Sequence, residues 1–252
     1  MIKVSVILPC YNVAPYIGKC LDSLLAQTLT DIEIICVDDK STDNTVSVVG
    51  EYMSRDNRIK LIHQPKNMGA GAARNTGRNV ARGQYVSFID PDDWVDENFY
   101  CELYRRACES DLDVVKAGMI HEYVETNETY VSRLNQLIKQ NSMFFYGEHA
   151  NAIYKLKFLN DNNIYYPTDV MTGQDAVFLS AIVLANPKMD VVDSVFYHYL
   201  ANRPGSLDSK KLAHAKVLSR IRMLEYKTEY LSSAKFKDDT DQQIYIERHI
   251  FA

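Results

Sequence analysis

The chain has 252 residues, of which 46% are hydrophobic and 24% are charged, as in an ordinary soluble globular protein. Its formal net charge of −5 gives no general attraction to nucleic acid or to an anionic membrane, so we expect no nucleic-acid partner. Any anionic ligand must be held by local groups or by a metal. Five cysteines without a C-x-x-C pair fit neither a disulfide framework nor a zinc site, which favours a reducing compartment and so a cytoplasmic protein. No apolar run reaches the ~18 residues of a membrane span, so we expect no transmembrane segment, and peripheral docking on a membrane through a partner stays open.

The first hundred residues alternate short apolar runs with amphipathic segments. The predicted strands are residues 3–9, 32–39, 59–64 and 84–90, and the predicted helices between them are 14–27, 44–55 and 71–82. This alternation, with Val- and Ile-rich strands, predicts a mostly parallel sheet covered by helices on both faces. Ligands of such sheets bind beyond the carboxyl ends of the strands, where PCYN, VDDKSTD and IDPDD should lie together.

The second half of the chain is less regular. Its predicted elements are a helix at 97–110, an extended segment at 113–125, a helix at 174–185, a strand at 189–201 and helical periodicity at 210–233. The last dozen residues are also expected to be helical. The polar stretch from Asn127 to Gly147 has no clear period and predicts no element.

Two polar segments follow the second and third strands. In VDDKSTDNT, Asp38 and Asp39 stand at a strand tip, where a carboxylate accepts bonds from a ribose or a base; alternatively, Asp39 and Ser41 only cap the turn into the next helix. NMGAGAARNTG differs from a dinucleotide fingerprint because Arg74 occupies the third glycine position. Arg74 and Asn75 are instead donors for carboxylates or phosphate, or else the small residues merely allow tight packing beside a solvated Arg74.

The segment DPDDWVDE follows the fourth strand and stacks negative charge at its end. It lacks the sixth-position glycine of an EF-hand loop beginning at Asp90. The D-x-D pair Asp90 and Asp92 suits a divalent ion shared with a diphosphate, because hard oxygen ligands hold such ions. Asp96 and Glu97 are expected only to favour the dipole of the following helix, and the role of Asp93 is left open.

Two single residues complete the candidate chemistry. Asp175, in MTGQDAVF, opens an apolar helix, where it is either a partner of the helix dipole or a general base facing a cleft. His198, in YHYLANRPGS, is either a core residue or a metal ligand beside the aspartates.

Six segments now stand in a characteristic order: SVILPCYN, IICVDDKSTDNT, NMGAGAARNTG, YVSFIDPDDW, TGQDAVF and YHYLANRPGSL. In this order and spacing the chain resembles the family 2 glycosyltransferases, which are inverting enzymes, from about Ile2 to Leu207. The resemblance implies the nucleotide-diphospho-sugar transferase (A-type) fold, an α/β fold with a mostly parallel central sheet flanked by helices. It also implies a catalytic domain at 1–207, with a nucleotide-sugar-binding half at 1–97 and an acceptor half at 98–207, and a helical extension at 208–252.

The resemblance also implies roles on the donor side of the site. Pro9, Tyr11 and Asn12 would line the nucleotide pocket. Asp39 would contact uracil or an equivalent base. The remaining donor-side residues would brace the cleft or contact the ribose or sugar; they are Arg74, Asn75 and Asp90.

The metal and acceptor sides are implied in the same way. Asp92 would bind Mg²⁺ or Mn²⁺ on the donor diphosphate, with His198 as a further candidate ligand, and Asp175 would be the general base. Gln174, Arg203 and Ser206 would lie toward the acceptor. The sequence departs from the family at Gln174, where Glu is usual, and also has Lys40 where Gly is usual after the paired aspartates.

The implied activity moves a sugar from a UDP-sugar to the hydroxyl of a glycan or lipid-linked acceptor, in surface or capsular polysaccharide synthesis at the inner membrane face. The C-terminal helices are candidates for a homodimer contact. Two alternatives stay open. One is a non-catalytic module that binds nucleotide sugars or glycans, and the other is a sugar nucleotidyltransferase, which PCYN disfavours because it replaces the expected glycine-rich loop.

Overall fold

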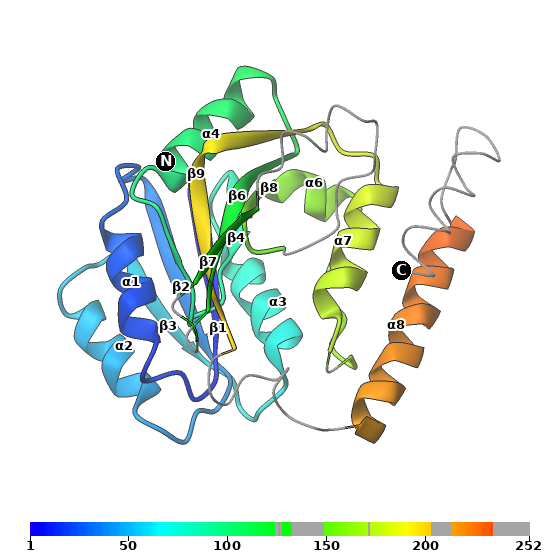
Figure 1. Ribbon diagram of the computed structural model, residues 1–252, viewed down its shortest axis with the longest axis horizontal. Coiled ribbons are helices and arrows are strands. Elements are labelled where there is room, and N and C mark those ends of the chain that lie inside the picture. Colours follow the sequence, from blue (N-terminus) through cyan, green and yellow to red (C-terminus); the bar gives the residue numbers. More distant parts are fainter. Residues whose placement is uncertain (124–125, 127, 133–148, 171, 203–212, 234–252) are drawn as a thin grey trace.

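The computed structural model describes all residues except 124–125, 127, 133–148, 171, 203–212 and 234–252. The described residues form a sheet in the order β3-β2-β1-β4-β8-β6-β9-β5, with β7 beside β6 and helices on both faces (Figure 1). The strands are β1 Val4–Cys10, β2 Ile32–Asp38, β3 Ile59–His63, β4 Tyr85–Phe88, β5 Trp94–Val95, β6 Val114–Tyr123, β7 Thr129–Ser132, β8 Ala152–Lys155 and β9 Met189–Ala201.

The described helices lie largely where the hydrophobic period predicts them. They are α1 Ile17–Leu25, α2 Thr45–Met53, α3 Ala70–Val80, α4 Phe99–Glu109, α6 Leu156–Asp161, α7 Gln174–Leu184 and α8 Ala213–Ser233. The short elements α6, β5, β7 and β8 were not predicted. The helix expected in the last dozen residues lies outside the described residues.

The first four strands are parallel, as predicted. β1 lies between β2 and β4, and β2 also pairs with β3, so Cys10 is opposite Asp38 at the carboxyl edge. The second half makes the sheet mixed: β8 is antiparallel to both β4 and β6, β5 is antiparallel to β9, and β6 is parallel to β9. The carboxyl ends of β1, β2 and β4 therefore share one edge, as the sequence indicated.

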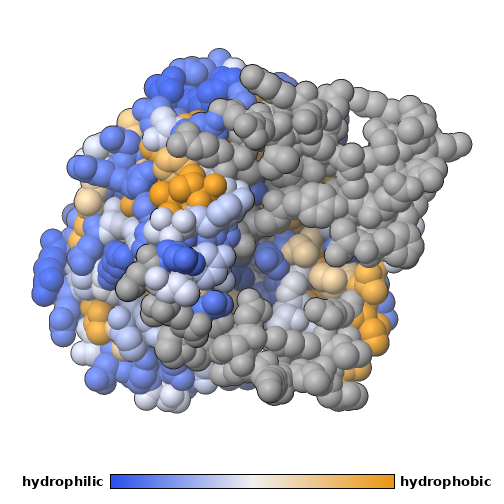
Figure 2. Space-filling view, viewed as in Figure 1, coloured by the Kyte–Doolittle hydropathy of each residue, from blue (hydrophilic) through white to orange (hydrophobic). Residues whose placement is uncertain are grey.

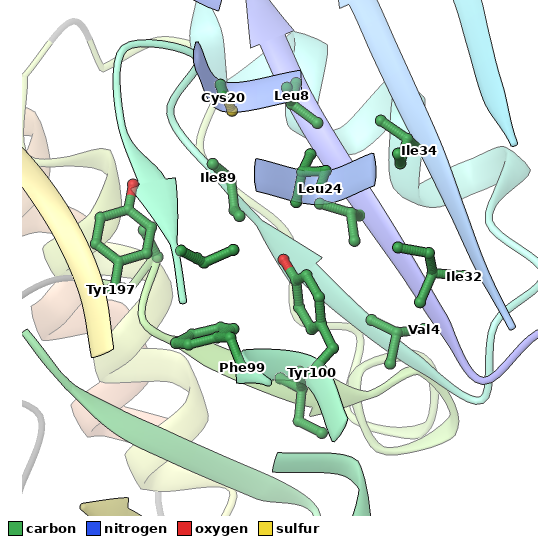
Figure 3. Packing of buried hydrophobic residues seen from close by; sticks show 14 of the residues in the cluster. Val4, Leu8, Cys20, Leu24, Ile32, Ile34, Ile89, Phe99, Tyr100 and Tyr197 are labelled. Atoms are coloured by element: carbon green, nitrogen blue, oxygen red, sulfur yellow. The ribbon is translucent and has the colours of Figure 1, made fainter. Parts of the chain in front are cut away.

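Alternate residues of the central strands face two separate cores. On one face, side chains of β1 and β2 pack with α1 and α4, and Figure 3 shows Leu8, Ile34, Leu24 and Tyr100 in this cluster. On the other face, β1, β2 and β4 pack with α3, α6 and α7. Each fully buried Leu or Ile side chain contributes about 1.5–3 kcal/mol to the free energy of unfolding. Packing on both faces therefore holds the strands, and the loops that follow them, in place. All five cysteines are free, as predicted, and three of them are buried in the first core.

Helix α8 packs against α7 and is tied to the segment between α6 and α7 by Asp169, which accepts bonds from Arg222 and Tyr226. Its outer face exposes three large hydrophobic side chains, and Figure 2 shows apolar surface over this helix; these residues are Leu218, Ile221 and Leu224. A homodimer through this face stays a prediction. Among the helices of the described ranges, none is long and apolar enough to cross a membrane.

Candidate active site

The loops after β1 and β2 are joined by the Asn12 side chain. Asn12 has a left-handed backbone with φ 53°, and its Oδ1 accepts bonds from the backbone N–H groups of Thr42 at 2.8 Å and Asp43 at 3.3 Å. Ser41 Oγ in turn accepts the Asn12 backbone N–H at 3.1 Å. Asn12 therefore shapes the predicted nucleotide pocket by bracing the two loops that would form it.

Asp39 is buried and holds the approach to α3. Its two carboxylate oxygens accept the backbone N–H groups of Met68 and Gly69, each at 2.7 Å, just before the helix begins. Recognition of a base by Asp39 stays a prediction. The structure shows that the same carboxylate fixes the loop between β3 and α3, which would form one wall of that pocket.

The other predicted residues of this corner lie beside these loops. Pro9 is buried within β1, and Tyr11, the first residue after that strand, is 46% exposed, so its ring is accessible to a ligand. Lys40 has φ 66°, a left-handed conformation that favours glycine. The turn after the paired aspartates thus keeps a glycine-like backbone although a lysine occupies it.

Arg74 joins the fourth strand to α7. From α3 its guanidinium donates to Asp90 Oδ1 at 2.6 Å and to Gln174 Oε1 at 3.4 Å, and it is almost fully buried. Burial alone would lower the pKa of Arg74, but the adjacent Asp90 carboxylate raises it above its ordinary value. The site therefore contains a fixed positive charge between Asp90 and the start of α7.

Asn75 holds the segment that lies across α3. Its amide donates to the backbone carbonyl of Tyr166 at 2.8 Å and accepts the Tyr166 backbone N–H at 3.0 Å. Gly71 allows this approach, because a Cβ there would meet the carbonyl oxygen of Pro167 and lie 2.9 Å from Gln174 Oε1. Asn75 thus braces the cleft through the backbone, and its direct contact with a donor stays a prediction.

Asp92 and Asp93, the two carboxylates that follow Asp90, have different surroundings. Asp93 is buried and accepts bonds from the Tyr197 hydroxyl and from the Leu200 backbone N–H at 2.8 Å. Burial, together with the charges of Asp92 and Asp90, raises the pKa of Asp93 well above its ordinary value. Asp93 therefore fastens this loop to β9. Asp92 is half-buried, and its contact with a metal stays a prediction.

His198 lies between two other carboxylates. Its Nε2 is 2.8 Å from Asp96 and its Nδ1 is 2.9 Å from Glu122, while its ring stacks on Trp94. Both ring nitrogens are thus within hydrogen-bond distance of a carboxylate, and a metal contact of His198 stays a prediction. Asp96, predicted as a helix-start charge, instead accepts the Phe196 backbone N–H at 2.7 Å and joins β5 to β9.

Helix α7 presents the candidate base. Asp175 is half-buried in the first turn, directly after Gln174, whose amide also donates to the Val170 carbonyl at 2.5 Å. An ionised glutamate has no N–H to donate, so Gln174 makes a hydrogen bond that the glutamate usual in the family could not make. Lys227 of α8 is buried within electrostatic reach of Asp175, so α8 covers this end of α7. Arg203 and Ser206 lie outside the described residues.

The donor chemistry of Asp90 and Asp92 fits a divalent cation. Carboxylate oxygens are the ligands that Mg²⁺ and Mn²⁺ prefer, and a diphosphate would supply further oxygens. Among the described residues, no group of three His, Cys, Asp or Glu side chains could hold a metal. A cation at Asp90 and Asp92 stays a prediction.

The structure adds His149, which was not predicted because it follows a polar stretch without a clear period. The residue is fully buried near Arg74, and its ring lies 5.5 Å from that of Tyr166. Burial first, and then the charge of Arg74, lowers the pKa of His149 to about 4. The imidazole is therefore neutral at pH 7.

We expect His149 to make stability depend on pH below neutrality. The folded pKa of about 4 lies below the ordinary value of 6.5, so the unfolded chain binds the proton first. The stability contributed by neutral His149 is therefore complete above about pH 6.5. The free energy of unfolding decreases as the pH falls toward 4, by up to about 3 kcal/mol. Denaturant unfolding between pH 7 and 4.5 should show a smaller loss for His149→Gln than for the wild type; equal slopes would contradict this.

Comparison with known proteins agrees with this geometry. The family described as "Glycosyl transferase family 2" matches residues 5–179. The uncharacterized glycosyltransferase EpsJ of Bacillus subtilis is 34% identical over 217 residues, covering 81% of this chain and 62% of EpsJ. A poly(ribitol-phosphate) beta-glucosyltransferase of Bacillus spizizenii is 32% identical over 215 residues, covering 81% of this chain and 33% of that protein. The chain thus spans less than two thirds of each relative's own length.

Solved structures share the fold. S. aureus TarS 1–349 in complex with UDP-GlcNAc is 25% identical with a TM-score of 0.80, covering 97% of this chain and 71% of that one. Mannosyltransferase PcManGT from Pyrobaculum calidifontis, in complex with GDP-Man and Mn²⁺, is 19% identical with a TM-score of 0.68, covering 98% and 70%. The sheet order, the carboxylates at its edge and a family match over more than half of the chain together show that this chain belongs to glycosyl transferase family 2.

Proposed function

We propose that the protein is an inverting, metal-dependent glycosyltransferase that moves a sugar from a UDP-sugar to the hydroxyl of a glycan or lipid-linked acceptor in surface or capsular polysaccharide synthesis. One observation carries the proposal. Arg74 contacts both Asp90 and Gln174, the neighbour of Asp175, so the candidate donor carboxylate and the candidate base flank one buried cation. TarS, solved with UDP-GlcNAc, and the poly(ribitol-phosphate) relative support a UDP-sugar donor and a surface-polymer acceptor.

Within the proposal, the residues divide the reaction between two sides of the cleft. Asn12 and Asp39 hold the loops around the nucleotide, and Tyr11 offers an exposed ring to it. Asp175 takes the proton of the acceptor hydroxyl as that oxygen attacks the anomeric carbon. The diphosphate leaves from the opposite face of the sugar, so a single displacement inverts the anomeric configuration.

The leaving diphosphate needs positive charge. Asp92, with Asp90 beside it, would hold Mg²⁺ or Mn²⁺, which when bound supplies charge neutralisation at the diphosphate oxygens. Arg74 orients Asp90, because its guanidinium donates to Asp90 Oδ1 at 2.6 Å.

The direct test is to incubate the protein with a panel of UDP-sugars and Mn²⁺ or Mg²⁺ and to measure release of UDP. Slow hydrolysis of one donor, faster with an acceptor glycan, is the expected result. Binding without turnover would indicate a non-catalytic module instead. Turnover that requires pyrophosphate or a nucleoside triphosphate would indicate a nucleotidyltransferase.

We expect Asp92→Ala to remove the metal dependence of UDP binding. In the wild type, Mn²⁺ should strengthen UDP binding by about tenfold or more, since each tenfold is about 1.4 kcal/mol. In the variant, calorimetry should give the same UDP affinity with and without Mn²⁺. Asp31→Ala is the matched control. Asp31 pairs with Lys3 just before the amino ends of β2 and β1, at the sheet edge opposite the candidate site. A wild type indifferent to Mn²⁺ would remove the metal from the proposal.

A further inference from the structure

Beside the Arg74–Asp90 pair lies a group of buried polar side chains that keep hydrogen-bonding atoms without a partner. Among the described residues these atoms include both ring nitrogens of His149, the Tyr166 hydroxyl and Arg74 Nε. Native proteins pair nearly all such buried atoms, with protein groups or with a bound molecule. Several of them in one place indicate that a polar group from a ligand completes this part of the site.

The geometry connects His149 with the candidate reaction centre. Its ring meets the Tyr166 ring at 5.5 Å and 73°, and the Arg74 guanidinium lies 5.1 Å from the same Tyr166 ring. Phe178 of α7 stacks on Tyr166 at 4.1 Å and fixes it. The Tyr166 ring therefore contacts both His149 and the cation that holds Asp90 and Gln174.

Charge and burial define what His149 can bind. The ring lies within the electrostatic reach of Asp90 and Asp175 as well as of the two cations Arg74 and Lys116. Its lowered pKa keeps it neutral at pH 7, with one N–H donor and one acceptor nitrogen. That pair matches a hydroxyl, which also donates and accepts, and it offers no charge to a phosphate.

We propose that His149 is a specificity-determining residue that forms a hydrogen bond with a hydroxyl of the sugar carried by the donor. The charges of Asp90 and Asp175 both act on His149, and these are the carboxylates proposed to contact the sugar and to act as the base. This inference rests on the proposed function. A buried group that must hydrogen-bond a hydroxyl discriminates strongly against sugars that place it elsewhere, because the protein atom then stays unpaired.

The test compares the affinities of UDP and of three UDP-sugars, UDP-glucose, UDP-galactose and UDP-GlcNAc, by calorimetry with Mn²⁺. In His149→Phe we expect UDP affinity within about twofold of the wild type and affinity for the preferred UDP-sugar reduced about tenfold, so that the three donors become similar. His149→Asn, which keeps a donor and an acceptor, should lose less. His121→Phe is the matched control. His121 is on β6, and its ring packs with Tyr130 of β7 and Tyr199 of β9.

The outcomes separate the two proposals. A wild type that binds neither UDP nor any UDP-sugar would overturn the proposed function, and this inference with it. Variants that bind UDP and every UDP-sugar as the wild type does would overturn the role of His149 alone. Loss of UDP binding in both His149 variants, with unfolding seen by circular dichroism, would make His149 a structural residue and also overturn the inference.

Discussion

Asp175→Asn should reduce sugar transfer by about 10²–10⁴-fold, the usual contribution of a positioned general base. The amide keeps the shape of the side chain at the start of α7 but cannot accept the proton of the attacking hydroxyl. The helix start itself should not change, because Gln174 holds it through Arg74 and the Val170 carbonyl. UDP-sugar affinity should therefore stay within about threefold of the wild type, since the residues proposed to contact the donor lie outside α7.

The measurement is UDP release with and without acceptor, alongside calorimetric binding of the donor. Asp161→Asn is the matched control, because Asp161 is exposed on α6 and pairs with Lys157 of the same helix at 2.5 Å. Transfer by Asp175→Asn at a rate near that of the wild type would exclude Asp175 as the base. Loss of donor binding together with transfer would mean that Asp175 contacts the donor.

Much of the first half of the site could be predicted from local sequence alone. The period of the apolar runs predicts β1, β2 and β4, and parallel strands bring their carboxyl ends together, so Asn12, Asp39 and Asp90 had to share an edge. The hydrophobic run after Gln174 likewise predicts α7 with Asp175 in its first turn. In each case the signal lies within a dozen residues.

The contacts that were not predicted join residues far apart in the chain. Asp96 meets His198 at a separation of 102 residues, and Asn75 meets Tyr166 at 91. Strand β5 has two residues, too few for a period, and exists because it pairs with β9. His149 acquires its neutral, buried state only from the packing around Tyr166. Such contacts are set by tertiary structure, which no local pattern records.

Arg74→Met should have the largest effect on both stability and donor binding. Removing the guanidinium leaves the Asp90 carboxylate and Gln174 Oε1 without the charge that holds them. Breaking a fully buried ion pair costs about 3–5 kcal/mol. Because the Asp90 side chain is 34% exposed, water screens part of this cost, and we expect the free energy of unfolding to fall by about 1–3 kcal/mol. UDP-sugar affinity should fall about tenfold or more, since Asp90 loses its orientation.

Denaturant unfolding and calorimetry on the same samples measure both effects. Arg105→Met is the matched control: Arg105 is exposed on α4, its partners are Glu102 and Glu109, and its loss should change the free energy of unfolding by less than about 1 kcal/mol. Adding Asp90→Asn to Arg74→Met should recover part of the lost stability, because the amide needs no counter-charge, but should not recover donor binding. Equal losses in the single and double variants would show that Arg74 stabilises the fold through Tyr166 and Gln174 rather than through Asp90.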